Sequence, residues 1–258
     1  MVLGRLAYIG TPVRCSTASL NSISVRPLRK DNEGEFTEYF RLRHRVYSFM
    51  GYLNRDVEEC RSKLEINEAD VRSIHLGAFF LRGARATLAG CARVVVNSEV
   101  DWGLQKMFER IAGTDPVAKE RLREAYPLGL PIFQSHEVLN KTMTVVLRSR
   151  ERVGELSRVI VDREFRGMGI SKKLVAYALA RAADQDLRRI FLECLSIHRG
   201  LYEGLGFRCI PGVEGTVVDV NRTMIAMELQ IKAAKKLPLP SVKKQAVIQM
   251  RHSAVGPH

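Results

Sequence analysis

Apolar and polar residues are distributed along the first third of the chain in patterns that predict strands and one helix. Alternation over Ser22–Leu28 predicts a strand. Apolar side chains near helical spacing predict a helix over Glu33–Tyr47. The apolar, β-branched runs Ile74–Leu81 and Thr87–Val96 flank a short stretch that contains Gly83, an arrangement typical of a β-hairpin.

The second half predicts a strand that leads into an amphipathic helix, followed by further strands. Glu155–Val161 is a strand-like run, and after Gly169 the apolar residues recur on one helical face to about Asp186. We expect the remaining elements to be a strand at Arg189–Leu195, a short helix at His198–Leu205 that Gly206 ends, a strand from Phe207 and a strand at Thr223–Ile231. This order predicts an α/β (α+β) fold, in which helices flank a central mixed sheet.

The middle of the chain gives a weaker signal. Residues 97–150 contain one helical piece at Gln105–Ala112 and a loop with Pro and Gly at residues 126–131. We expect this stretch to contribute to a specificity pocket.

Length and charge together predict one domain with basic flanks. The 258 residues, 46% of them hydrophobic, suit one domain, expected at residues 22–231, with flexible basic segments at residues 1–21 and 232–258. Of the net charge of +13, residues 1–30 contribute five Lys and Arg and residues 229–258 contribute six, with no acid in either. The nearly neutral body makes nucleic acid an unexpected partner. We interpret the flanks as solubilising, with peripheral membrane contact or an organelle transit peptide as alternatives.

Cysteine usage and hydropathy favour a cytoplasmic protein without a metal site. The five cysteines are scattered and lack a CxxC spacing, so neither a disulfide framework nor a zinc site is expected. No run of eighteen apolar residues occurs, so the sequence predicts no transmembrane segment.

A glycine-rich turn between a predicted strand and a predicted helix carries the strongest signal. In Arg166-Gly167-Met168-Gly169-Ile170-Ser171, the glycines allow backbone N–H groups to face an anion, and the helix N-terminus adds partial positive charge. The segment resembles motif A of the GNAT superfamily of N-acetyltransferases, with Ser171 in its last small position. A turn without a ligand is the alternative.

The resemblance implies the GNAT fold, with a central, mostly antiparallel sheet. It also implies that acyl-CoA or acyl-phosphopantetheine is the co-substrate and that no cofactor is bound permanently. The implied donor-binding residues are Val159, Val161, Arg166, Gly167, Met168, Gly169, Ile170 and Ser171.

A second segment, Leu201-Tyr202-Glu203-Gly204-Leu205-Gly206-Phe207, resembles motif B of the same superfamily. In that motif a tyrosine lies near the thioester sulfur, so the resemblance implies that Tyr202 protonates the departing thiolate. The alternative is that Tyr202 only packs within its short helix.

A third set of matches narrows the subclass. The segment from Arg41 to Tyr47, followed by Gly51-Tyr52, resembles the N-terminal signature of acyl-homoserine-lactone (autoinducer) synthases and long-chain N-acyl amino acid synthases. Four further matches follow in the same order: Glu65-x-Asn67-x-x-Asp70, Ser73-Ile74-His75, Gly90-Cys91-Ala92-Arg93 and Glu155-Leu156-Ser157-Arg158. Tyr47, Tyr52 and Asn67 replace Phe, Trp and an acid of the autoinducer synthases, which favours the amino acid synthase branch. The resemblance implies that the acceptor is bound by Arg43, Tyr47, Tyr52, Asp70 and Arg93.

Three residues are candidates for catalysis. Glu155 would take the amine proton, Arg158 would bind an acceptor carboxylate while the backbone after it contacts the oxyanion, and Tyr202 would act on the thiolate. Glu155 and Arg158 stand three apart on a strand, so we expect them on opposite faces. The alternative role of Glu155 is a structural ion pair with Arg43 or Arg93. His75, at the start of an apolar strand, is expected in the core.

These observations predict an N-acyltransferase that moves a long-chain acyl group from acyl carrier protein or acyl-CoA to an amino acid or similar small amine. One alternative is an acetyl-CoA-dependent N-acetyltransferase of a small amine or a protein lysine. Another is a catalytically silent binding module of the same fold. An acidic carrier protein would need a basic patch, for which Lys172, Lys173 and Arg181 are the candidates.

Overall fold

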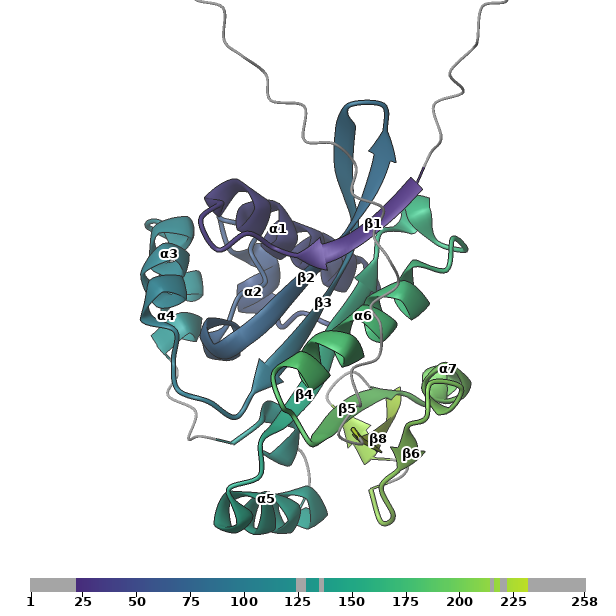
Figure 1. Ribbon diagram of the computed structural model, residues 1–258. Coiled ribbons are helices and arrows are strands. Elements are labelled where there is room, and N and C mark those ends of the chain that lie inside the picture. Colours follow the sequence, from purple (N-terminus) through teal and green to yellow (C-terminus); the bar gives the residue numbers. More distant parts are fainter. Residues whose placement is uncertain (1–21, 124–128, 135–136, 214–215, 219–221, 232–258) are drawn as a thin grey trace, which may run out of the picture.

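A single twisted sheet organises the molecule. The computed structural model describes residues 22–123, 129–134, 137–213, 216–218 and 222–231. The strands are β1 (Ser22–Pro27), β2 (Ser73–Arg82), β3 (Arg85–Val96), β4 (Val153–Val161), β5 (Arg189–Leu195), β6 (Arg208–Cys209), β7 (Thr216–Val218) and β8 (Arg222–Gln230). They form one sheet in the order β1-β2-β3-β4-β5-β8-β6, with β7 paired to β8 (Figure 1). Only β4 and β5 pair in parallel among these strands. The predicted mixed, mostly antiparallel sheet is therefore confirmed.

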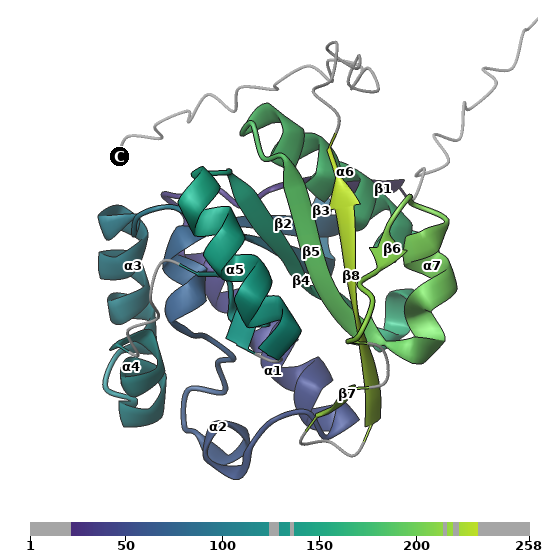
Figure 2. The same cartoon turned by 90° about the horizontal axis from the view of Figure 1, so that it is seen from below.

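Helices cover both faces of this sheet (Figures 1 and 2). On one face, α6 (Ile170–Asp184) and α7 (Arg199–Glu203) enclose a core with side chains of β3, β4 and β5. The opposite face is covered by α1 (Glu33–Met50), α3 (Trp102–Ala112), α4 (Pro116–Arg123) and α5 (Glu137–Ser149). The short helix α2 (Arg55–Glu59) and four 3-10 segments, Glu68–Arg72, Pro131–Gln134, Arg163–Phe165 and Ser196–His198, complete the described elements.

Most predicted elements occur close to their expected positions. The first helix is longer than predicted because Gly51, with a φ of 68°, ends it only after Met50. The helices α4 and α5 were not predicted, although both bury apolar side chains against the sheet or its neighbours. The segments 1–21 and 232–258, predicted to be flexible, lie outside the described residues, as does part of the predicted loop at 126–131. Within the described part of the chain, no helix has the length and apolar character needed to span a membrane.

Candidate functional site

A bulge in β4 lies at the centre of the candidate site. Cys91 of β3 pairs with Ile160 and Arg93 pairs with Ser157, so two residues of β4, Arg158 and Val159, stand opposite one residue of β3. Arg158 has a φ of 56°, a left-handed conformation that costs a non-glycine residue about 1–2 kcal/mol. Such a bulge turns its backbone and side chain away from the regular alternation.

The bulge corrects one expectation from the sequence. A regular strand would place Glu155 and Arg158 on opposite faces, because they stand three residues apart. The extra residue instead brings the Arg158 side chain to Glu65, with Nη2 donating to Oε1 over 2.9 Å. Glu65 belongs to a buried network on the α1 side of the sheet. Glu155 faces the same side, because it stands opposite Phe191, which is buried there.

Next to the bulge, β4 and β5 separate. Their parallel pairing includes only the positions from Val153 opposite Arg189 to Glu155 opposite Phe191. Beyond this point, the remaining residues of β4, including Val159 and Val161, have no ladder partner in β5 among the described residues. The edges that face the gap therefore carry backbone groups available to an extended ligand.

The glycine-rich turn follows directly at the end of β4. Gly167 and Gly169 have φ values of 81° and 70°, and a Cβ at either position would meet nothing within 4 Å. Open, left-handed backbone of this kind suits the close approach of an anion to the N-terminus of α6. Met168 is exposed, Ile170 is buried and anchors the helix, and Ser171 is partly exposed. Arg166 is exposed and its Nε lies 3.5 Å from the Val161 carbonyl oxygen, to which it donates.

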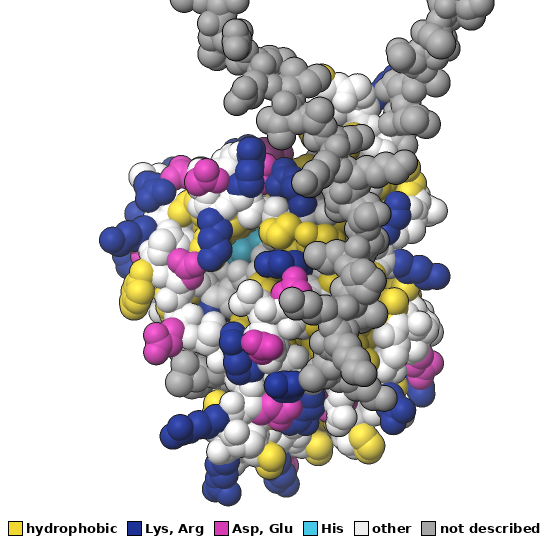
Figure 3. Space-filling view, in the orientation of Figure 1, with side chains coloured by type: hydrophobic (Ala, Val, Ile, Leu, Met, Phe, Trp, Pro, Cys, Tyr) yellow, Lys and Arg dark blue, Asp and Glu magenta, His cyan; other side chains and the backbone are white. Residues whose placement is uncertain are grey.

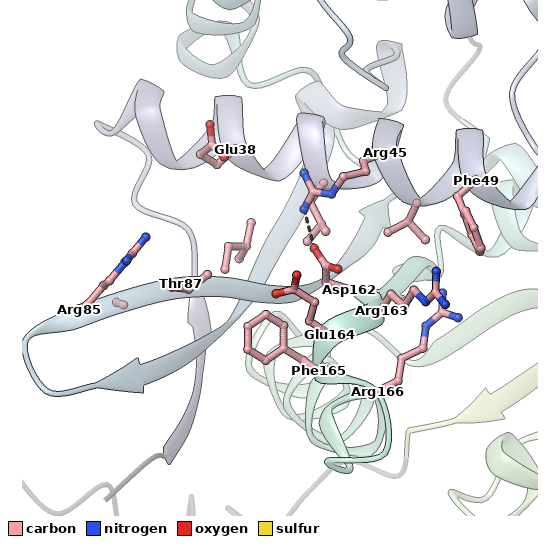
Figure 4. Close-up of a pocket in the computed structure, with 14 residues that line it drawn as sticks. Glu38, Arg45, Phe49, Arg85, Thr87, Asp162, Arg163, Glu164, Phe165 and Arg166 are labelled. Carbon is pink, nitrogen blue, oxygen red and sulfur yellow. Dashed lines mark hydrogen bonds and ion pairs between the residues drawn. The ribbon is translucent and has the colours of Figure 1, made fainter. Parts of the chain in front are cut away.

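A cavity of about 750 Å³ lies beside this turn, between α1 and the start of β3. Figure 4 shows Arg45 extending from α1 to the carboxylate of Asp162, where Nη2 and Oδ2 are 2.6 Å apart. Arg163 and Arg166 point toward one side of the cavity, and the exposed ring of Phe49 lies above them. The cavity thus combines apolar walls with a charged rim that includes Arg166 of the turn.

A buried ion-pair network supports the bulge from the α1 side. Arg43 of α1 donates to Glu65, and its Nη1 donates to Asp70 over 2.7 Å. Arg93 of β3 donates through Nη1 to Asp70 over 3.1 Å and to Asn67 over 2.8 Å, and through Nε to the Ser157 hydroxyl over 3.2 Å. Arg43 and Asp70 are 0% exposed and Arg93 is 1% exposed.

This burial changes how three predicted acceptor-binding residues are understood. The guanidinium groups of Arg43 and Arg93 are occupied by internal partners, and neither these groups nor Asp70 is open to an acceptor in this structure. The ion pairs considered for Glu155 do occur at both arginines, but their acidic members are Glu65 and Asp70.

The network is electrostatically matched. Burial alone would raise the pKa of Asp70 and of Glu65, but the adjacent arginines outweigh it and hold both values below their ordinary range. Burial would likewise lower the pKa of Arg158, and the nearby Glu65 carboxylate raises it instead. All of these groups therefore stay charged near neutral pH.

Arg158 at the bulge contacts Tyr47, which in turn lies near Tyr52 and Tyr202. The Arg158 guanidinium lies 5.4 Å from the ring centroid of Tyr47, which contacts Tyr52 edge to face at 5.7 Å. Burial raises the pKa of Tyr202, and the proximity of Cys194 and Tyr47 adds to the effect. Tyr202 is 8% exposed and packs against Phe207, so its hydroxyl stays protonated at neutral pH. The Arg158 side chain is 24% exposed, which makes it more accessible than Arg43 and Arg93, the other arginines considered for an acceptor carboxylate.

Glu155 is held in place by backbone. Its Oε2 accepts from the Ile132 N–H over 2.8 Å, and the residue is 6% exposed. Burial lowers the pKa of Arg72, although the nearby Glu68 and Glu155 carboxylates oppose this shift. Glu155 therefore lies near Arg72, three residues before the bulge at Arg158 on β4.

Three residues of the site were not among the predicted site residues. Glu65 was recognised only as part of a motif, yet it connects Arg43 to Arg158. Ser157 binds Arg93, and Glu193 is a single acid within the apolar strand β5. An isolated carboxylate in an apolar strand is the sequence signal that could have identified Glu193.

Charges on the surface are mixed. On the part of the face that Figure 3 leaves visible, Lys and Arg side chains alternate with Asp and Glu. Lys172 and Lys173 are exposed in the first turn of α6, whereas Arg181 pairs with Asp184 over 2.9 Å. Arg181 is thus engaged within its own helix.

Comparisons with known proteins agree with this fold. A model of the acetyltransferase (GNAT) family matches residues 122–207. The solved structure of FeeM, an N-acyl amino acid synthase from uncultured soil microbes, matches with a TM-score of 0.52 and 16% identity over 81% of this chain and 91% of that chain. BjaI, a CoA-dependent acyl-homoserine lactone synthase, matches in its structure with MTA with a TM-score of 0.50 and 16% identity, over 82% of this chain and 84% of that chain. At such identities, likeness establishes a common fold. No curated protein matches the chain in sequence.

Proposed function

We propose that the chain transfers an acyl group from a pantetheine thioester to an amine, because a model of the acetyltransferase (GNAT) family matches residues 122–207 and the fold is like that of an N-acyl amino acid synthase. The donor is acyl-CoA or acyl carrier protein, and the acceptor is an amino acid or a similar small amine. The observation that carries the proposal is the alignment of three features along β4. These are the turn at residues 166–171, the gap beside β5 and the bulge at Arg158.

Each feature suits one part of the donor. The open glycines and the N-terminus of α6 suit the pyrophosphate or phosphate. Pantetheine is an extended chain with two amide groups, so it can bond to the unpaired edge of β4 as an added strand would. A chain that begins at the turn and follows β4 brings its thioester to the bulge. The cavity beside Arg166 offers room for the part of the donor beyond the pyrophosphate.

The residues around the bulge suit the transfer itself. A backbone N–H following Arg158 would donate to the thioester oxygen as it gains negative charge. Tyr202, which stays protonated at neutral pH, would give its proton to the departing thiolate. The partial exposure of Arg158, which pairs with Glu65 and lies beside Tyr47, supports it as the residue that would bind an acceptor carboxylate.

The preference for a long acyl chain and an amino acid rests on the five ordered segments that resemble N-acyl amino acid synthases. Those segments contain Arg43, Asp70 and Arg93, to which we assign the support of Arg158 and the bulge in place of direct acceptor contact. Tyr47 and Tyr52 remain candidates for one wall of the acceptor pocket.

The test is a donor and acceptor screen. Purified protein is mixed with acyl-CoA thioesters that range from acetyl to long-chain, or with carrier-bound donors, and a panel of amino acids, and free thiol release is measured with a thiol reagent. Mass spectrometry identifies the products, both in vitro and in lipid extracts of cells that make the protein. We expect N-acyl amino acids with long-chain donors. Turnover only with acetyl-CoA and small amines would replace this substrate assignment, and no turnover with acyl-CoA or carrier-bound donors would refute acyl transfer.

A further inference from the structure

Glu193 of β5 shares a sheet face with Glu155 of β4. In the parallel ladder, Glu155 stands opposite Phe191, and side chains that are two residues apart on a strand share a face. Phe191 is buried against Phe133 and Val153, on the side of the sheet covered by α1 and α5. Glu193 therefore points to the face that also holds the Arg158 and Glu65 network.

Its level along the sheet places Glu193 near the bulge. Two residues beyond the last paired position, β5 has reached Glu193 and β4 has reached Ser157. Ser157 immediately precedes the bulge at Arg158. Because the strands separate over these two residues, the Glu193 carboxylate lies across the gap from the backbone that would hold the thioester carbonyl.

The two glutamates differ in their freedom to act. Glu155 is 6% exposed and accepts a hydrogen bond from the Ile132 N–H. Glu193 is partly exposed, and within the described residues no hydrogen bond or ion pair of its carboxylate is found. A general base must reach the proton that it removes, and an unengaged carboxylate at the edge of the gap meets this condition better than one bound to the backbone.

The charged surroundings of Glu193 favour a base. Burial raises its pKa above the ordinary range, and the Glu155 carboxylate on β4 adds to the effect. Arg72 interacts with the Glu155 and Glu68 carboxylates, and its Nη2 donates to the Gly129 carbonyl over 2.7 Å. On β8 the residue opposite Glu193 is Ala226, which carries no charge.

We propose that Glu193, on β5, is the general base of the acyl transfer. This inference rests on the proposed function and replaces Glu155 in that role. The Glu193 carboxylate takes a proton from the acceptor ammonium, and the neutral amine attacks the thioester carbon. The C–N bond forms as the C–S bond breaks, and the nitrogen gives up its second proton. Tyr202 donates its hydroxyl proton to the departing thiolate sulfur. An amide and a free thiol result, and the two protons taken from nitrogen restore Tyr202 and enter the solvent. Glu155 supports Ile132 and keeps the pKa of Glu193 raised.

The experiment compares isosteric variants in the full chain, with an acyl-CoA and an acceptor amine that the wild type uses. Glu193→Gln and Glu155→Gln are measured beside Glu228→Gln. Glu228 is the matched control because it lies on β8 opposite Phe191, on the same sheet face as Glu193 but away from the gap. For each variant, kcat and KM are determined from thiol release across pH, and folding is checked by the thermal unfolding midpoint.

We expect Glu193→Gln to lower kcat about 100-fold with little change in KM, as for the loss of a general base. The fall of kcat at acid pH, which reflects protonation of Glu193, should disappear in this variant. Glu193→Asp should recover part of the rate, and Glu228→Gln should keep the wild-type kcat. Full activity of a folded Glu193→Gln variant, or loss of the acid limb in Glu155→Gln alone, would overturn the assignment. A wild type without turnover would instead refute the proposed function.

Discussion

A few single residues determine how the buried charges beside the gap are paired. Arg43 is 0% exposed, yet two carboxylates, Glu65 and Asp70, neutralise it. Glu65 in turn binds Arg158, whose backbone is left-handed. A buried charge that lost its partner would be costly, so each member of this chain of contacts fixes the position of the next. The strained bulge is thus stabilised by ion pairs that connect Arg43 of α1 to Arg158 through Glu65.

His75 makes stability depend on pH. Its ring contacts Phe36, Tyr39, Phe40 and Phe108, and burial lowers its pKa to about 4 despite the nearby Asp70. Between pH 6.5 and 4 the unfolded chain binds a proton that the folded chain does not. The free energy of unfolding should therefore fall as pH decreases through this window, by about 1.4 kcal/mol per pH unit. Below pH 4.5, protonation of Asp70 and Glu65 should reduce it further, because their pKa values are lowered in the folded state.

Denaturant titrations at several pH values measure this effect. His75→Phe should remove the slope between pH 6.5 and 4.5, even if it changes stability at neutral pH. His198→Gln alters an exposed histidine and serves as the control. An unchanged slope in His75→Phe would mean that another group titrates in this window.

At the scale of elements, substitutions should distinguish a role of the glycine-rich turn in donor binding from the structural role that other left-handed turns share. Gly167 and Gly83 have φ values of 81° and 61°, and a Cβ at either would meet nothing within 4 Å. Alanine at either position should cost about 1–2 kcal/mol of stability through backbone strain alone. Only Gly167→Ala should also raise the KM for acyl-CoA, because its methyl group occupies the approach to the N-terminus of α6.

Gly83, in the hairpin between β2 and β3, is the matched control. Thermal unfolding compares the two stability losses, and thiol release gives KM for both variants. A similar rise in KM for Gly83→Ala and Gly167→Ala would contradict a donor site at the turn.

The sequence predicted those elements whose periodicity is long and regular. Strand β5 was predicted with its observed bounds, and α6 within two residues, because apolar residues recur over most of their length. In contrast, α4 has eight residues and buries only Ala118 and Leu122, too few for a helical period to stand out. The bulge in β4 was not predicted because its extra residue is defined by the register against β3, a tertiary property.

The same limit applies to the site. Motif resemblance identified Arg43, Asp70, Arg93 and Arg158, which do lie together in the fold. The partners of Arg43 and Arg93 could not be predicted, because the choice of Glu65 and Asp70 over Glu155 depends on tertiary packing. Glu193 is 35 residues from Arg158 along the chain, and only the parallel ladder of β4 and β5 relates them.

At the scale of the whole molecule, most of the net positive charge lies outside residues 22–231. Residues 1–21 and 232–258 carry eight Lys and Arg side chains and no acid, which leaves +5 of the net +13 within residues 22–231. The boundary is set by β1, because Ser22–Pro27 pair with β2 and Leu28 is 5% exposed. A deletion that extended to residue 30 would remove an edge strand, whereas one that ends at residue 21 spares it.

A chain of residues 22–231 should therefore keep the stability of the full chain and turn over acyl-CoA with an unchanged kcat, because the core and the candidate site lie within it. Its affinity for vesicles that contain anionic lipid should be lower than that of the full chain, since attraction to an anionic surface weakens by about 1 kcal/mol for each Lys or Arg lost near it. Sedimentation with vesicles, thermal unfolding and thiol release test these points on the same preparations. Loss of turnover in a stable, folded 22–231 chain would place part of the functional machinery in the basic termini and would favour a protein whose activity depends on what those termini bind.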